Sequence, residues 1–164
     1  MKYPIGIQSF DRIIEDGYVY VDKTELIYNL THESSIYFLS RPRRFGKSLL
    51  ISTLEAYFLG KKELFKGLAM EGLEKDWTTY PVLHLDLNAR KYVDASSLNA
   101  ILNQHLESWE AIYGDEKKDR APEERFAWLI EKACRTTGRN VVVLVDEYDK
   151  PMLQAIGNEP LLTD

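Results

Sequence analysis

Cysteine is almost absent from this chain of 164 residues, which contains Cys134 and no other. A single cysteine excludes an internal disulfide and a cysteine-based metal cluster. Histidine is also scarce, and His84 has no second histidine or cysteine at the spacing of a zinc site. Because Cys134 falls on the apolar side of a predicted helix, we expect it to be a buried structural thiol.

Long apolar runs are missing too, since no stretch approaches the roughly 20 apolar residues of a membrane span. The first residues lack the basic and then apolar pattern of a secretion signal. We therefore expect a cytoplasmic protein with no membrane partner.

Positive charge is in deficit, with a net charge of −5 and a sequence pI of about 5.3. This balance argues against a broad nucleic-acid surface. One local exception is a group of four cations within seven residues: Arg41, Arg43, Arg44 and Lys47. A cluster of this kind in an acidic chain favours a small polyanion, such as a nucleotide, as the partner.

The basic cluster lies between an apolar run, Ile36–Leu39, and an amphipathic run, Leu49–Phe58. A strand, a short loop with Gly-Lys-Ser and a helix together are typical of a phosphate-binding loop. Backbone N–H groups and the positive end of the helix dipole would face an anion there. Lys47 would add a charge for the outer phosphates, and the Ser48 hydroxyl would be a ligand of Mg²⁺.

The match to the phosphate-loop pattern is incomplete, because Arg41 occupies the position of its first glycine. A basic loop that caps a helix is the alternative interpretation of Gly46-Lys47-Ser48.

A second signal is the aliphatic run Val141–Val145, which ends in Asp146 and Glu147. If this strand is parallel to Ile36–Leu39 in one sheet, its two carboxylates lie beside the phosphate loop. Asp146 would then bind the Mg²⁺ ion, and Glu147 would orient and deprotonate a water that attacks the terminal phosphate. An acidic turn at the end of a strand is the plain alternative.

The remaining pattern predicts an α/β fold with a mainly parallel sheet and helices on both faces. Strands are expected at 36–39, 82–87 and 141–145, with strand composition also at 18–21. Helices are expected at 11–15, 23–30, 49–58 and 96–113 and from Pro122 onward. Asp22 is expected to cap the helix at 23–30, although Asp22 and Lys23 would also be placed to hold a nucleotide base.

Four segments together resemble the AAA-ATPase-like family of predicted bacterial ATPases, and the resemblance spans nearly the whole chain. They are Tyr18-Val19-Tyr20-Val21-Asp22-Lys23-Thr24, Phe38-Leu39-Ser40-Arg41-Pro42-Arg43-Arg44-Phe45-Gly46-Lys47-Ser48, Pro81-Val82-Leu83-His84-Leu85-Asp86 and Val145-Asp146-Glu147-Tyr148-Asp149-Lys150-Pro151. In that family the first loop glycine is likewise replaced, so Arg41 is no departure from it.

The resemblance implies a P-loop NTPase-type fold that binds ATP and Mg²⁺. It places the nucleotide at the loop residues Arg43, Arg44, Phe45, Gly46, Lys47, Ser48 and Leu49. Relatives continue well beyond the acidic pair, so residues 1–164 are expected to be the N-terminal part of a truncated ATPase-like domain. The missing part would hold further strands, a sensor residue, an arginine finger and often a nuclease-like domain, through which nucleic acid is a possible partner.

Two functions follow from these motifs. The first is a module that hydrolyses ATP in the full-length protein, with Lys47 and Glu147 as its catalytic residues. The second is a nucleotide-binding switch with little or no hydrolysis, coupled to a nuclease-like or other effector domain. Arg43 or Arg44 would stabilise phosphate charge, or contact a neighbouring subunit of a homo-oligomer or nucleic acid. A purely structural domain would make both motifs coincidental.

Overall fold

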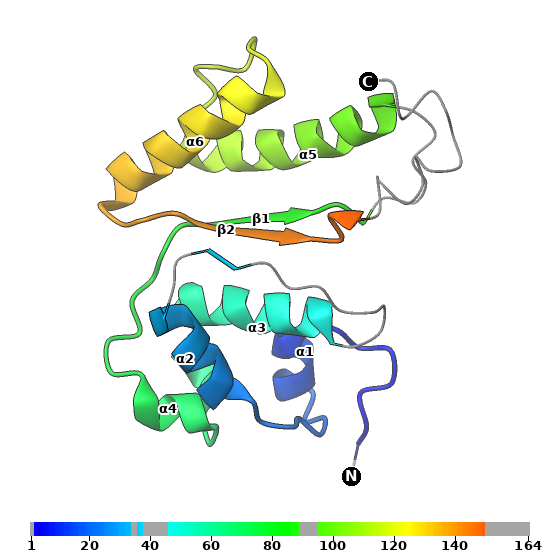
Figure 1. Cartoon of the computed structure of the whole chain (residues 1–164), viewed down its shortest axis with the longest axis vertical. Helices are drawn as coiled ribbons and strands as arrows, with labels where there is room; N and C mark the ends of the chain where they lie inside the picture. Colours follow the sequence, from blue (N-terminus) through cyan, green and yellow to red (C-terminus); the bar gives the residue numbers. More distant parts are fainter. Residues whose placement is uncertain (1, 34–35, 38–45, 89–94, 150–164) are drawn as a thin grey trace. The chain divides into compact units, whose positions relative to one another are not determined.

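The computed structural model describes residues 2–33, 36–37, 46–88 and 95–149 (Figure 1). The chain divides into two units, Met1–Tyr80 and Pro81–Asp164, each of which the structure defines by itself. In chain order, the elements of the first unit are α1 (Phe10–Glu15), α2 (Thr24–Glu33), α3 (Lys47–Phe58), the 3-10 helix η1 (Lys62–Phe65) and α4 (Ala69–Leu73). Those of the second are β1 (Val82–Asp86), α5 (Ala95–Tyr113), α6 (Pro122–Thr137) and β2 (Val142–Asp146).

The core of the first unit is largely aromatic. Phe10 of α1 and Phe65 of η1 are both fully buried, with ring centroids 4.9 Å apart. The rings of Trp77 and Phe65 also pack together, with centroids 5.2 Å apart. Aromatic side chains bury large areas, so this cluster lets α1, η1 and the segment around Trp77 share one core.

A buried hydroxyl joins α2 to α4. The Thr24 side chain is inaccessible to solvent, accepts the Met70 backbone N–H at 3.0 Å and donates to Asp22 at 2.7 Å. Buried polar groups need such partners, so these bonds fix where α2 begins.

The second unit contains a two-stranded parallel sheet, in which Val82 pairs with Val142 and Asp86 with Asp146. Parallel strands need a long crossover connection, and α5 and α6 supply it. Its hydrophobic core is formed by Leu83, Leu106, Trp109 and Leu129. Figure 1 shows α5 and α6 together on one side of the two strands.

A buried ion pair also joins these two helices. The Arg125 guanidinium donates to both carboxylate oxygens of Glu110, at 2.7 and 2.8 Å, and to Asn103 at 2.6 Å. The hydrogen bonds from Arg125 hold the pKa of Glu110 below its usual range, so the carboxylate stays ionised. Bidentate geometry of this kind fixes the relative orientation of α5 and α6.

The predicted helices are confirmed. Each begins close to the residue expected, and α6 has Pro122 in its first turn and ends at Gly138 in a left-handed C-cap. Both signals follow from elementary backbone chemistry, because proline suits a helix start and glycine a helix end.

Two of the predicted strands are confirmed with small shifts in their ends, as Val82–Asp86 and Val142–Asp146. Residues 18–21 have strand composition, and Val19 donates its N–H to the Lys2 carbonyl at 2.8 Å, but they join no sheet among the described residues. Residues with a high strand propensity form a strand only where another segment of the chain pairs with them. Of the strand predicted at 36–39, Ile36 and Tyr37 have no regular secondary structure, and the other half lies outside the described residues.

The protein is therefore α/β, with a small parallel sheet and several helices. Within the described part of the chain, no helix has the length and apolar character needed to cross a bilayer.

Candidate functional site

The helix predicted to follow the phosphate loop is α3, and it opens as expected. Gly46 stands at its N-cap in the left-handed conformation (φ 78°, ψ 15°), and its carbonyl accepts the first helical bond from Leu50 at 3.0 Å. Lys47 and Ser48 are the first two helical residues. Glycine adopts this conformation at little steric cost, so Gly46 allows the chain to turn directly into the helix.

The first turn of α3 has the electrostatic character of an anion site. It carries no acidic residue, and neither does that of α5, whereas α1, α2, α4 and α6 each have at least one in the first turn. The N–H groups of Ser48 and Leu49 lie at the positive end of the helix dipole. The predicted loop residues Arg43, Arg44 and Phe45 lie outside the described residues.

Side-chain hydrogen bonds position α3 within the first unit. The Ser52 hydroxyl accepts the backbone N–H of Phe10 at 2.8 Å, at the start of α1. The hydroxyl of the next residue, Thr53, donates to the Leu49 carbonyl at 2.8 Å. Because Phe10 is fully buried, the first bond ties α3 to the core.

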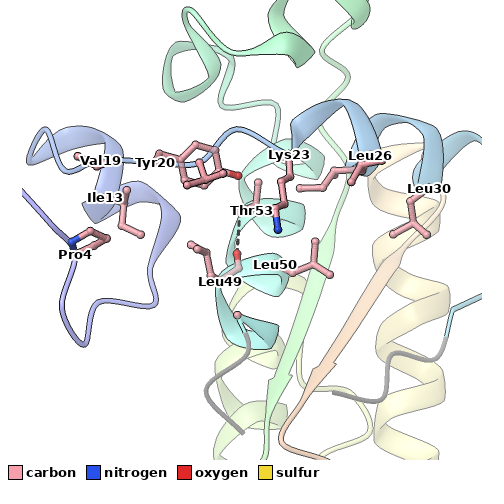
Figure 2. Close-up of a pocket in the computed structure, with 13 residues that line it drawn as sticks. Pro4, Ile13, Val19, Tyr20, Lys23, Leu26, Leu30, Leu49, Leu50 and Thr53 are labelled. Carbon is pink, nitrogen blue, oxygen red and sulfur yellow. Dashed lines mark hydrogen bonds between the residues drawn. The ribbon is translucent and has the colours of Figure 1, made fainter. Parts of the chain in front are cut away.

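A cavity of about 410 Å³ lies beside this helix start (Figure 2). Its walls come from Pro4, from α1, from the segment 19–23, from α2 and from the start of α3. The lining residues are Pro4, Ile13, Val19, Tyr20, Val21, Lys23, Leu26, Ile27, Leu30, Gly46, Leu49, Leu50 and Thr53. Most are aliphatic, so the cavity is an apolar space whose boundary includes the N-cap glycine of α3.

Asp22 does not line this cavity. One of its carboxylate oxygens accepts the N–H and the hydroxyl of Thr24, at 2.9 and 2.7 Å, and the other accepts the N–H of Ala69 at 2.7 Å. Burial alone would raise the pKa of Asp22, but these hydrogen bonds outweigh it and lower the pKa below its ordinary value. The capping interpretation is therefore confirmed for Asp22, while Lys23 lines the cavity.

The acidic pair follows β2 as the sequence predicts. Asp146 is the last residue of the strand and 5% exposed, and it accepts the N–H of Glu147 at 2.9 Å. Glu147 has a φ of 58°, which is uncommon for a residue other than glycine. The chain therefore turns sharply just after the strand.

Asp86 is the register partner of Asp146, so both parallel strands end in a carboxylate. The His105 ring donates from Nε2 to the Asp86 carbonyl at 3.0 Å, which ties α5 to this edge. Ligands of open α/β sheets bind at the carboxyl ends of strands, and this is the edge where Asp146 lies.

Lys47 and Ser48 belong to the first unit, and Asp146 and Glu147 to the second. Each half of the predicted site is thus formed within its own unit. The meeting of the two halves, and with it a shared Mg²⁺ ion held by Ser48 and Asp146, stays a prediction.

Sequence reasoning missed the cavity. Leu26, Ile27 and Leu30 recur on one face of α2, yet Ile27 is buried and Leu26 is 66% exposed at the cavity. The apolar face of α2 can be read from the sequence, but the pattern alone does not distinguish a cavity wall from a core contact.

Comparison with known proteins identifies the family to which this chain belongs. The model of a family described as "Predicted AAA-ATPase" matches residues 4–164. The chain therefore belongs to the AAA-ATPase-like family, as the four motif segments indicate. No solved structure matches the chain significantly.

A relative from Azotobacter chroococcum mcd 1 is described as "Uncharacterized protein in vnfD 5'region". It is 44% identical over 154 residues, which cover 93% of this chain and 30% of the relative. The chain thus spans less than a third of that protein's length.

Proposed function

We propose that this chain is the nucleotide-binding part of an ATPase, which binds ATP with Mg²⁺ and hydrolyses it within the longer protein. The observation that carries the proposal is the start of α3, where a left-handed glycine is followed at once by Lys47 and Ser48. Family membership supports ATP as the nucleotide.

Each predicted site residue has a role in this proposal. Lys47 and the N–H groups of Ser48 and Leu49 bind the phosphates, and Gly46 lets the backbone approach them closely. Arg43, Arg44 and Phe45 complete the loop, with the two arginines balancing phosphate charge.

Two carboxylates and a hydroxyl complete the chemistry. Ser48 and Asp146 bind Mg²⁺, which is usually held by one or two protein oxygens, substrate phosphates and water. Glu147 orients the attacking water and accepts its proton. A bound Mg²⁺ ion would neutralise part of the negative charge on the phosphates.

Two variants separate binding from hydrolysis. At 100 times its dissociation constant, Mg-ATP should raise the melting temperature of the 164-residue chain by about 5–10 °C. Lys47→Ala should abolish this shift, because the outer phosphates lose their cation. Glu147→Gln should keep the shift, and in the longer protein it should stop phosphate release.

The outcomes discriminate clearly. A folded parent chain with no shift would contradict nucleotide binding. A normal shift with no turnover in the longer protein would identify the switch rather than the ATPase. Unchanged turnover in Glu147→Gln would remove Glu147 from the mechanism.

A further inference from the structure

Residues 74–80, which we call the strap, follow α4 and lead to β1, at the end of the first unit (Figure 1). The first end of the strap is held by the Glu74 carboxylate. One oxygen accepts the Tyr57 hydroxyl of α3 at 2.5 Å, and the other accepts the N–H groups of Lys75 and Asp76, both at 2.9 Å. Burial alone would raise the pKa of Glu74, but these hydrogen bonds outweigh it and lower the pKa, so the carboxylate stays ionised.

The other end of the strap is held against the last residue of α3. Tyr80 donates its N–H to the Phe58 carbonyl at 2.8 Å, and the two rings pack edge to face with centroids 5.8 Å apart. Between the two ends, the Trp77 ring packs on Phe65 and Tyr57, with centroids 5.2 and 6.1 Å apart. The strap is therefore closed on α3 and η1 by both side-chain and backbone contacts.

Two features of Trp77 oppose this closed arrangement. Its φ of 45° lies in the left-handed region, where a bulky residue is strained. Its indole Nε1 is buried, yet it has no hydrogen-bond partner in the described part of the chain. A buried donor without an acceptor is unfavourable, and exposure to water removes that penalty. Opening of the strap would therefore relieve both features.

The strap also approaches the end of α3 closely. Gly60 follows the helix with a φ of 70°, and a Cβ at this position would lie 2.9 Å from the Trp77 carbonyl oxygen and 2.8 Å from Thr79 Oγ1. Both distances are shorter than a Cβ contact allows, so the strap closes fully only on a glycine.

We propose that the strap is a conformational switch, which opens and closes as one unit while the rest of the first unit stays folded. Strained residues are common in switch segments. The closed strap holds the chain that leads to the second unit against α3. The open strap releases residues 74–80 as free chain, with a reach of up to about 25 Å. The switch needs no nucleotide, so the proposed function can fail without affecting it.

Native-state hydrogen exchange of the 164-residue chain, followed by NMR at low urea concentrations, tests the switch. The strap probes are the indole N–H of Trp77 and the backbone N–H of Tyr80, which open together if the strap is one unit. The reference probes are the backbone N–H groups of Leu54 and Ala56, which are buried in α3. Local opening exposes little surface and depends weakly on urea, whereas global unfolding depends on it strongly.

In the wild-type chain, the two strap probes should exchange with equal protection, at least tenfold faster than the reference probes and with little dependence on urea. Gly60→Ala, whose Cβ would clash with the closed strap, should speed the strap probes at least tenfold. Gly17→Ala is the matched control, because Gly17 has a φ of 67° but a Cβ there would meet nothing within 4 Å. It should speed the reference probes alone.

If Gly60→Ala does not fold, Tyr57→Phe replaces it. This variant removes the hydrogen bond to Glu74 and keeps the ring, and it should speed the strap probes several-fold. Strap probes that exchange at the rate and urea dependence of Leu54 would overturn the switch, because the strap would then open only on unfolding. Unequal protection of Trp77 and Tyr80, or equal acceleration of the strap probes in Gly17→Ala and Gly60→Ala, would also overturn it.

Discussion

At the scale of single residues, Asp22 shows how a motif residue can serve the fold. Its position before a helix suits either a cap or a ligand contact, and the hydrogen bonds decide for the cap. Both oxygens accept from backbone N–H groups, one at the start of α2 and one at the start of α4. The sequence could not separate these interpretations, because Ala69 is distant in the chain.

The hydrogen bonds of Asp22 predict a pH dependence. Because the folded state lowers its pKa, the ionised carboxylate stabilises the fold above its unfolded pKa of about 3.9. That contribution is lost as the pH falls through the lower folded pKa. Asp22→Asn should therefore reduce the free energy of unfolding at pH 7 by about 1 kcal/mol, and by less at pH 3.

Urea denaturation at the two pH values measures this difference. Asp16→Asn is the control, since its carboxylate has no hydrogen bond to a described residue. A loss in Asp22→Asn that is the same at pH 3 and pH 7 would show that charge plays no part in the cap.

At the scale of secondary structure, local signals carried most of the information. Helix α6 follows from its apolar stripe, Pro122 and Gly138 alone. Residues 18–21 have equally clear strand composition, yet they form no strand, because a strand exists only where another chain segment pairs with it. Helices satisfy their backbone locally, and this difference explains why they were the better predicted elements.

A matched pair of glycines tests the tight turn after α3. Gly60 and Gly17 both follow helices with similar φ values, 70° and 67°. A Cβ on Gly60 would lie 2.9 Å from the Trp77 carbonyl, whereas one on Gly17 would meet nothing within 4 Å. Gly17→Ala should therefore cost about 1 kcal/mol for the left-handed backbone, and Gly60→Ala about 2–4 kcal/mol, since the clash adds to it.

Thermal and urea unfolding of the two variants measure this difference. Equal losses would show that Trp77 moves aside without cost and that the turn is not tightly packed.

At the scale of the whole molecule, each of the two units contains one half of the proposed site. Both halves were predicted from the sequence: Gly46, Lys47 and Ser48 lie at the start of α3, and Asp146 is the last residue of β2. The parallel pairing of β1 and β2 supports the assignment of Asp146 to a carboxyl edge. The cavity could not be predicted, because it depends on which apolar side chains of α2 and α3 are left uncovered after packing.

A crystal structure with Mg²⁺ and a non-hydrolysable ATP analogue tests the central claim most directly. The account predicts phosphates at the N–H groups of Ser48 and Leu49 with Lys47 beside them, and a metal shared by Ser48 and Asp146. A nucleotide bound elsewhere, or one bound at α3 with Asp146 remote from its metal, would contradict the account.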